Sequence, residues 1–509
     1  MRVFFNNLQK MSILGALMIA SQGVFAQHYA DGLYFSESDG KAMIIRGDQE
    51  YKGRVVIPEV LIWYEDNIRD KDHRRESTVT SVSFDAFENC KELISVTLPN
   101  SIDPKELGYY HGCTALQEVV LPESFTELGN FFSLYYPYGT FEGCTSLTSI
   151  NIPKHTKVIA ARTFYGCSSL KVDFPDDIEY VGDSAFVGCN FTSTSLTIPY
   201  HEESEYYDPV GIGAFFNTNL LTLIYNAKNF VDCSLGGCKS LKKLIVGPQV
   251  ESITSTLGDG EGLESITVDP NNSLYDSREN CNAIINTAGN ELVAGFSVST
   301  IPSSVESIGY WAFKNCAGLK HIEFPSSLKR VDRDAFAGSG LEEVTIPASI
   351  DWGESIFQEC HQLKSVTLPE GLTVIPFSMF EKCDALESVT IPSTMKDIGK
   401  MAFYGCTSLK SVKSLAQDAP KMRDNTFSKV TYENCPLYIR ADAINYSSGY
   451  WWYKFKNVVK FTPDNVSAIA NRHEPLSVYT LDGLQVVSPQ HGVNVLQMSD
   501  GTKKKVVVK

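Results

Sequence analysis

The sequence lacks the residue groupings that usually build catalytic or metal sites. Its 509 residues contain no C-x-x-C pair and no H-E-x-x-H motif, and its nine histidines are scattered along the chain. Zinc is held by closely spaced Cys and His residues, and many hydrolytic serines lie in a G-x-S-x-G turn, which is also missing. We therefore expect a protein that is not an enzyme and has no catalytic residues, metal site or cofactor.

Positive charge is also scarce. The chain has 44 Lys and Arg residues against 60 Asp and Glu residues, which gives a formal net charge of −16 at pH 7. Such a surface repels the phosphates of nucleic acids and of anionic lipids. We therefore expect no nucleic acid among its partners.

Long apolar runs are confined to the N-terminus. Arg2 and Lys10 precede an apolar stretch over residues 11–20, and small residues end the segment at Ala26. This order is typical of a secretory signal peptide over 1–26, which is too short to remain as a transmembrane helix. Its removal takes away two basic residues and no acidic one, so the net charge becomes −18. We expect a mature chain without an integral membrane segment, secreted or held at the cell surface on the exterior of the outer membrane.

A phrase of about 23 residues recurs through most of the chain. An aromatic residue is followed at steps of three by Cys, Leu and a β-branched residue, and then by an apolar residue and Pro. The clearest copies carry Cys360, Cys383 and Cys406, which lie 23 residues apart. A fixed period indicates a solenoid, in which each repeat buries its apolar face only against its neighbours. We count roughly thirteen to fifteen turns between residues 80 and 440.

Each turn is expected to contain one short strand. The end of the phrase, Leu-x-x-Val-x-Leu, alternates with period two, and Pro then ends the strand because it cannot donate to the ladder. The residues that follow carry the chain across a second face to the next aromatic residue. The predicted turn is therefore strand, corner, short second segment and corner.

Thirteen cysteines in an exported chain would ordinarily suggest disulfides. Ten of them share one slot of the repeat: Cys90, Cys113, Cys144, Cys167, Cys189, Cys238, Cys316, Cys360, Cys383 and Cys406. Parallel side-chain directions in stacked rungs disfavour bonding between them, and Ser339 replaces Cys in one turn. We expect a ladder of reduced, buried thiols, in which Cys acts as a compact apolar residue and weak donor.

The repeat resembles a known family. Ala402-Phe403-Tyr-Gly-Cys406-Thr-Ser-Leu409-Lys-Ser-Val412, preceded by Ile391-Pro392-Ser393, is similar to the BspA-like (Treponema pallidum type) leucine-rich repeat, and the match covers residues 80–440. The resemblance implies an α/β-class leucine-rich repeat solenoid, right-handed and β-rich, with short parallel strands stacked rung on rung and with β caps. It also implies a protein on the surface of, or secreted by, a Bacteroidetes-type bacterium.

The same resemblance sets the expected boundaries. They are a signal peptide over 1–26, an N-terminal β cap over 27–80, leucine-rich repeats over 81–440 with a hairpin interruption at about 270–300, a C-terminal cap over 441–463 and a small β tail over 464–509. Trp451 and Trp452 are assigned to the closing cap in preference to a sugar platform, because an open solenoid end needs covering. The tail looks like the sorting domains of type IX secretion; a small β module that is simply retained is the alternative.

Two surfaces are candidates for binding. Outward strand positions such as Lys364, Ser365 and Thr367 are small and mixed in charge, and a merely solvated face explains them equally well. The second surface comes from two insertions, one between Cys113 and Cys144 and one after Pro199. Both lie between a strand's Pro and the next aromatic residue, so we expect them to emerge from the same side. Exposed tyrosines give large contact area at low entropy cost, so we assign ligand binding to Tyr135, Tyr136, Tyr138, Tyr200, Tyr206 and Tyr207. The alternative is that these rings fold back as satellite core.

The expected function is that of an exported, non-catalytic binding or adhesion protein. It would present an extended solenoid surface to host or bacterial macromolecules, and its partner would be an extracellular protein or glycan. A glycan-binding surface protein and a structural component of the cell envelope are the alternatives.

Overall fold

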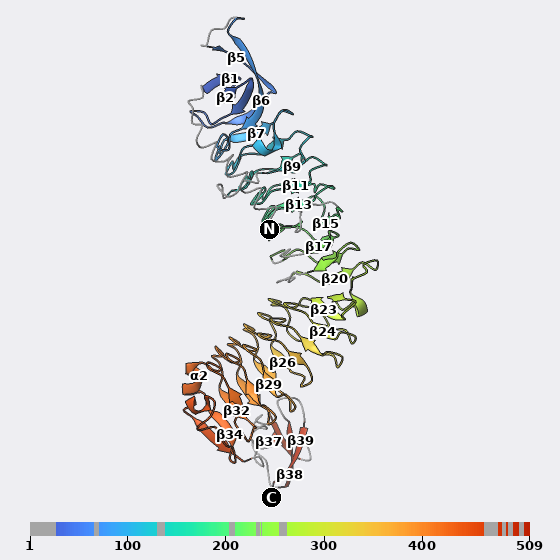
Figure 1. Ribbon diagram of the computed structural model, residues 1–509, viewed down its shortest axis with the longest axis vertical. Helices are drawn as coiled ribbons and strands as arrows, with labels where there is room; N and C mark the ends of the chain where they lie inside the picture. The colour runs from blue at the N-terminus through green and yellow to red at the C-terminus, as the bar shows by residue number, and fades with distance from the viewer. Residues whose placement is uncertain are drawn as a thin grey trace. The chain divides into compact units, whose positions relative to one another are not determined.

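The computed structural model describes residues 27–65, 71–129, 138–202, 209–230, 235, 237–253 and 262–462, and the strands of the tail. The chain divides into two compact units. The first contains the described residues up to Leu341 together with Asp351–Ile356, and the second contains Glu342–Ile350 and the residues from Phe357 onward. Each unit contains a β-rich solenoid of short parallel strands (Figure 1). The signal peptide assigned to 1–26 lies outside the described residues.

The first unit begins with a mixed five-stranded sheet in the order β1-β2-β3-β6-β5. Its strands are β1 (Gln27–Ala30), β2 (Leu33–Ser38), β3 (Lys41–Ile44), β5 (Val60–Tyr64) and β6 (Arg74–Val82). Pairing is antiparallel except between β3 and β6. The alternating burial of β2 and β3 places Leu33, Phe35, Ala42 and Ile44 in the core.

The solenoid of the first unit has two narrow parallel sheets, joined by corners. The main sheet starts with β4 (Gly53–Val56), β7 (Leu93–Thr97), β8 (Glu118–Val120) and β10 (Ser149–Ile150). The second sheet contains β9 (Glu127–Leu128), β11 (Val158–Ile159) and β13 (Tyr180–Val181). Further along, β12 (Lys171–Val172) pairs with β14 (Asn190–Phe191). A new stretch of main sheet follows, made of β15 (Ser195–Ile198), β16 (Thr222–Tyr225), β18 (Lys243–Val246) and β20 (Ser265–Val268), and beside it β17 (Asn229–Phe230) pairs with β19 (Ser252–Ile253).

Antiparallel strands interrupt the coil near the end of the first unit. They are β21 (Tyr275–Asp276), β22 (Ile284–Asn286) and β23 (Glu291–Ala294). Parallel pairing then resumes from β23 through β24 (Ser307–Ile308) and β25 (Arg330–Val331) to β27 (Asp351–Trp352). The short helix η2 (Pro104–Glu106) lies between β7 and β8, and η3 (Arg278–Asn280) follows β21.

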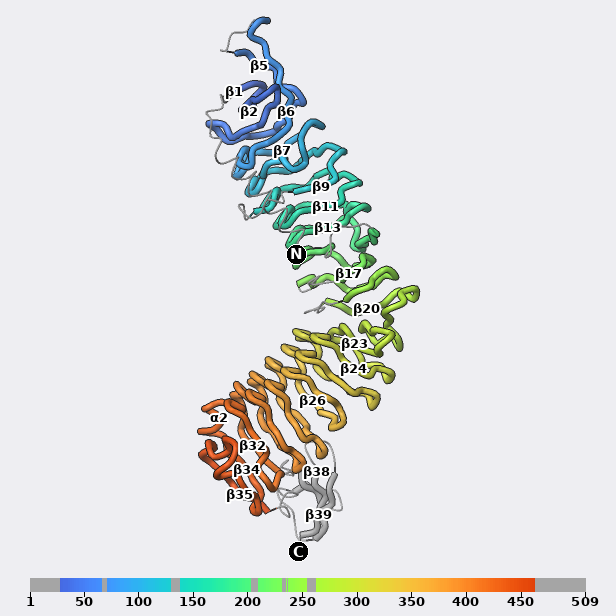
Figure 2. The backbone as a smooth tube through the Cα atoms, in the orientation of Figure 1, coloured from blue at the N-terminus to red at the C-terminus, as the bar shows by residue number. Residues whose placement is uncertain are grey.

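The second unit repeats the same rung with greater regularity (Figure 2). Its main sheet contains β26 (Glu343–Thr345), β28 (Ser365–Thr367), β30 (Ser388–Ile391), β32 (Ser411–Ser414), β34 (Leu437–Arg440) and β35 (Val458–Phe461). Its second sheet contains β29 (Val374–Ile375), β31 (Asp397–Ile398) and β33 (Lys421–Met422). Among the described residues the single α-helix is α2 (Lys429–Asn434), which Ser428 caps through its side chain.

The last rungs of this unit end on a buried tryptophan. Trp452, in the short helix η4 (Trp452–Lys454), is fully buried and donates from Nε1 to the carbonyl oxygen of Pro420 at 2.8 Å. In the tail, β36 (Ser477–Thr480), β37 (Gln485–Val486), β38 (Gly492–Gln497) and β39 (Lys503–Val508) form an antiparallel sheet in the order β37-β36-β38-β39. No helix within the described ranges has the length and apolar character needed to cross a bilayer.

An aromatic ladder runs through the core of each unit. In the first unit the rings of Phe87, Tyr110 and Phe141 stack with centroids 5.1 and 5.2 Å apart. In the second unit Phe380 stacks on Phe357 at 5.6 Å and on Phe403 at 5.4 Å, with interplanar angles of 7° and 10°. Stacked rings contribute dispersion and quadrupole interactions beyond their area burial. Equivalent residues of successive repeats therefore stack on one another in register, as the period predicts.

The cysteine of each repeat links one rung to the next through a contact of its Sγ atom. The Sγ atoms of Cys167, Cys383 and Cys406 each lie 3.1 Å from the carbonyl oxygen of an aromatic residue in the preceding rung. All cysteines within the described residues are buried and free. The ladder thus satisfies a buried carbonyl with a small donor, which explains why this slot takes Cys.

Left-handed residues make the two sharp bends around the aromatic residue in most rungs. The residue two positions before it has positive φ, as at Arg162, Asp334 and Met401. The residue before the cysteine does too, and this position is often Gly, for example Gly166 with φ of 74°. Glycine adopts such an angle without the steric cost that a Cβ brings.

Tyr110 places a hydroxyl group in an aromatic ladder that has Phe in the neighbouring rungs. Its ring is fully buried and its hydroxyl has no hydrogen-bond partner among the described residues, whereas the neighbouring rungs have Phe87 and Phe141 there. Because an unsatisfied buried hydroxyl is costly, Tyr110→Phe should raise the free energy of unfolding by about 1 kcal/mol in urea denaturation. The control is Tyr446→Phe, which removes hydrogen bonds to Ser414 and Ala416 and should destabilise by roughly 1–2 kcal/mol. Destabilisation by both variants would contradict the assignment.

Candidate binding surface

The two insertions that carry the predicted tyrosines attach at opposite ends of the second-sheet strand. Leu128, Ile159 and Val181 are in register, and Val210 bridges to Val181. The first insertion comes after this position in its rung, before Phe141, whereas the second comes before it, after Pro199. Most of both insertions lies outside the described residues, so their emergence from the same side stays a prediction. A two-residue strand shows no alternation, so the sequence pattern did not reveal where in the segment it lies.

The described tyrosines of the insertions lie in different surroundings. Tyr138 is 44% exposed. Tyr200 is half-buried, in the chain that follows β15. The other assigned residues, Tyr135, Tyr136, Tyr206 and Tyr207, lie outside the described residues.

Tyr138 belongs to a group of aromatic and charged side chains, which we call the Tyr138 cluster: His111, Tyr138, Glu142, Arg162 and Tyr165. The rings of His111 and Tyr138 stack with centroids 4.1 Å apart and an angle of 4° between their planes. Arg162 donates from Nε to Glu142 Oε2 at 2.9 Å and through Nη2 to Oε1. Its guanidinium carbon lies 4.2 Å from the centroid of the Tyr165 ring, which is cation–π geometry.

The repeat itself brings this cluster together. His111, Glu142 and Tyr165 each follow the aromatic residue of their own rung, so they form one column on the outside of the aromatic turn. Backbone hydrogen bonds of 2.8 Å fix the column, from Gly112 N–H to the Glu142 carbonyl and from Gly143 N–H to the Tyr165 carbonyl. Sequence reasoning considered the strand face and the insertions, and so missed this third face.

The charges of the cluster are paired internally. The side chains of Arg162 and Glu142 are 37% and 12% exposed, and the hydrogen bond to Glu142 raises the pKa of Arg162 above its ordinary value. Gly139 N–H also donates to Glu142 Oε2 at 2.8 Å. The cluster therefore presents flat ring surfaces and a guanidinium plane in fixed positions, which suits stacking and hydrogen bonding better than proton transfer.

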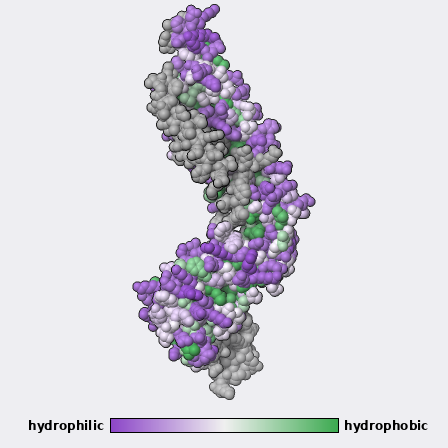
Figure 3. Space-filling model, viewed as in Figure 1, coloured by the Kyte–Doolittle hydropathy of each residue, from purple (hydrophilic) through white to green (hydrophobic). Residues whose placement is uncertain are grey.

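The strand face is a less selective surface. Charged side chains at equivalent positions of adjacent rungs neutralise each other, as Lys410 does with Glu387 at 2.9 Å and Lys364 with Glu342 at 3.3 Å. Such exposed pairs contribute roughly 0–1 kcal/mol each. The face of the molecule seen in Figure 3 is mostly hydrophilic, with apolar side chains in small groups. Within the described residues, no group of three or more His, Cys, Asp and Glu side chains is arranged to hold a metal ion.

Comparison with known proteins agrees with this architecture. The family model for the BspA type leucine-rich repeat region matches residues 71–135, 134–257, 294–410 and 373–471, well over half of the chain. The chain therefore belongs to the BspA type leucine-rich repeat family. No curated protein matches the sequence.

Solved structures with a similar fold come from several bacteria. A leucine-rich repeat protein from Eubacterium ventriosum is 18% identical with a TM-score of 0.39, over 80% of this chain and 88% of that one. One from Bacteroides ovatus is 18% identical with a TM-score of 0.36, over 86% and 98%. A leucine rich cell surface protein from Faecalibacterium prausnitzii is 19% identical with a TM-score of 0.38, over 87% and 97%.

Proposed function

We propose that the protein is an exported, non-catalytic binding protein that presents its solenoid surface to host or bacterial macromolecules by adhesion. The observation that carries this proposal is the Tyr138 cluster, in which the exposed Tyr138 ring stacks on His111 and an ion pair joins Arg162 to Glu142, across three rungs. Rigid aromatic residues and Arg give large contact area at low entropy cost, and they dominate protein recognition sites. The ligand is an extracellular protein or glycan, and Tyr138 is the first contact we assign to it.

Export and placement are part of the same proposal. Residues 1–26 serve as the signal peptide, 27–80 and 441–463 cap the repeats, and about 270–300 form a hairpin interruption. Residues 464–509 serve as a sorting domain of the type IX route, as in a Bacteroidetes-type bacterium with repeats of the Treponema pallidum type. Support comes from the order of charged, apolar and small residues in the leader and from the acidic composition. The protein is then secreted or displayed on the exterior of the outer membrane.

The binding proposal predicts the effect of one side chain. The mature protein should bind saturably to immobilised host-matrix extract or bacterial surface material, measured by biolayer interferometry. Tyr138→Ala should weaken this binding at least tenfold, about 1.4 kcal/mol, because it removes the exposed ring without touching the core. The control is Tyr310→Ala, which removes a 62% exposed ring elsewhere in the same unit.

Four outcomes separate the alternatives. Weakening by Tyr138→Ala alone supports recognition at the cluster. Equal weakening by both variants, or by neither, contradicts it. Saturable binding to a glycan array but to no protein assigns the surface to glycans, and absence of binding to either points to a structural role in the envelope.

A further inference from the structure

The main sheet of the first unit is interrupted between β10 and β15, where, within the described residues, β12 pairs only with β14. In the regular rungs Pro follows the repeat cysteine after nine residues, as from Cys144 to Pro153. The next two rungs depart from this count in opposite directions, with eight residues from Cys167 to Pro175 and ten from Cys189 to Pro199. In these two rungs β12 and β14 pair over two residues, and β15 starts a separate sheet.

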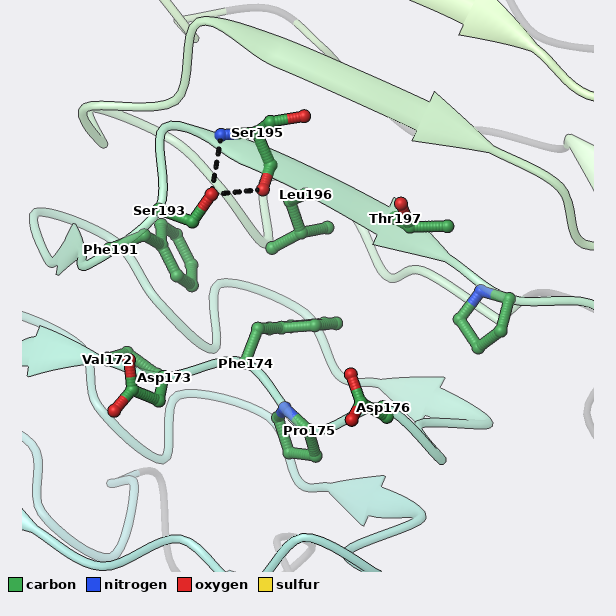
Figure 4. Close-up of a pocket in the computed structure, with 11 residues that line it drawn as sticks. Val172, Asp173, Phe174, Pro175, Asp176, Phe191, Ser193, Ser195, Leu196 and Thr197 are labelled. Carbon is green, nitrogen blue, oxygen red and sulfur yellow. Dashed lines mark hydrogen bonds between the residues drawn. The ribbon is translucent and has the colours of Figure 1, made fainter.

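A hollow of about 400 Å³ lies at this break (Figure 4). Phe174 and Phe191 line it with their ring centroids 6.0 Å apart at an angle of 69°, and Leu196 adds to the apolar wall. Its polar lining includes Asp173, Asp176 and residues of β15. The volume lies within the range of about 300–1,000 Å³ that is usual for small-ligand sites.

One edge of β15 is open at the hollow. The carbonyl groups of Thr194 and Ile198 accept hydrogen bonds from Thr222 N–H at 3.0 Å and Asn226 N–H at 2.9 Å, in the following rung. Backbone groups alternate in direction along a strand, so those of Ser195 and Thr197 point the other way, toward the break. β15 has no second strand partner among the described strands.

The hydroxyl of Ser193 closes part of this edge. It accepts from Ser195 N–H at 3.2 Å and donates to the Ser195 carbonyl at 2.8 Å (Figure 4). The N–H and C=O of Thr197 have no such partner among the described residues. An open edge of this kind is a template for an added strand.

The acidic residues at the rim of the hollow favour a ligand with a basic side chain. Asp173 and Asp176 are exposed and form no ion pair within the described residues, and the chain as a whole is strongly acidic. Exposed carboxylates beside an apolar wall complement a basic side chain with a long aliphatic stem, which Lys and Arg supply.

We propose that this hollow binds a short extended peptide segment that pairs with the open edge of β15 at Thr197 and places a Lys or Arg side chain at the acidic rim formed by Asp173 and Asp176. The site is separate from the Tyr138 cluster, so either can fail without the other. Backbone pairing gives the affinity, and the two carboxylates give the preference for a basic residue.

A peptide library tests the proposal directly. The immobilised mature protein is incubated with a library of random nonapeptides, and the retained peptides are sequenced and then remade with a fluorescent label for anisotropy titration. We expect enrichment of Lys or Arg flanked by β-branched residues. Thr197→Pro should weaken the best peptide at least tenfold, because it removes an edge N–H that forms no bond with β16, and edge strands tolerate Pro.

The acidic rim is tested with matched variants. Asp173→Asn with Asp176→Asn should weaken the Lys or Arg peptide at least tenfold but leave its norleucine counterpart within twofold. The control is Asp177→Asn, whose carboxylate pairs with His155 at 2.7 Å, and Tyr138→Ala should leave peptide binding unchanged. Circular dichroism of each variant establishes that it is folded.

The outcomes that overturn the proposal are equally definite. They are a library without enrichment over the Thr197→Pro protein, enrichment of acidic peptides, or binding that the rim variants do not change. Saturable binding of oligosaccharides at the hollow in place of peptides would also reject it.

Discussion

Phe380→Ala is expected to lower the free energy of unfolding of the second unit by about 3–5 kcal/mol, the usual cost of deleting a buried Phe ring. The ring is fully buried and stacks on both Phe357 and Phe403. Its removal opens a cavity and leaves both neighbours without a stacking partner. Because each rung contacts only its neighbours, the damage should spread to the adjacent rungs first.

Hydrogen exchange measured by mass spectrometry resolves this effect by rung. We expect the amides of the two neighbouring turns, at Phe357 and Phe403, to lose most protection, while β15 and β16 in the first unit keep theirs. The control Thr390→Ala alters an exposed strand position and should change stability by less than about 0.5 kcal/mol. A loss below about 1 kcal/mol for Phe380→Ala would mean that the aromatic ladder does not hold the coil together.

The thiol ladder predicts a large difference in cysteine reactivity between the native and unfolded protein. Burial raises the pKa of Cys144, Cys189 and Cys406 to about 12. Only the thiolate reacts with iodoacetamide, and a rise of about three units in the pKa lowers the population of the thiolate roughly a thousandfold. At pH 8 we expect almost no alkylation of these thiols in the native protein and complete alkylation after denaturation. Thiols that stay blocked after denaturation without reductant would show disulfides in place of the ladder.

The same shift predicts a loss of stability at alkaline pH. Above the ordinary thiol value of about 9 the unfolded chain releases protons that the folded chain retains, so unfolding becomes more favourable as the pH rises from 9 to 12. Each such thiol contributes of order 1 kcal/mol per pH unit over this window. The melting temperature, measured between pH 7 and 10.5, should therefore fall above pH 9. Cys406→Ala should make the melting temperature fall less steeply with pH. A slope that this variant leaves unchanged would assign the alkaline loss to other groups.

The period of the sequence was sufficient to predict the rung, since every turn repeats the same Phe, Cys, Leu and Val slots. It was not sufficient to predict which carbonyl each thiol meets, because that contact joins residues 26 positions apart, as in Cys383 and Phe357. The small strands of the second sheet have no pattern of their own. The sequence therefore did not show on which side of these strands each insertion is attached.

Other features are visible in the sequence, but their effect depends on which residues become neighbours in adjacent rungs. The counts of eight and ten residues before Pro175 and Pro199 coincide with the interruption of the main sheet, yet each differs from nine by a single residue. Likewise His111, Glu142 and Tyr165 look unrelated along the chain, and only register shows that they form one column. Candidate sites of this protein arise where the repeat is irregular or where its outward positions accumulate.

Register between rungs is tested most directly by engineered cross-links in the second unit. Ser365 on β28 lies opposite Ser388 on β30, and both are exposed. Neighbouring strands are about 4.8 Å apart, and exposed side chains can rotate toward each other, unlike the buried thiols of the ladder, so oxidation can join this pair. Thr390, two residues further along, lies about 8 Å from Ser365 and is out of reach. With Ser365→Cys and Ser388→Cys, mild oxidation followed by peptide mapping should find the new cross-link in nearly every molecule. With Ser365→Cys and Thr390→Cys it should find almost none, and equal yields from the two pairs, or a preference for the second, would contradict the stacked register.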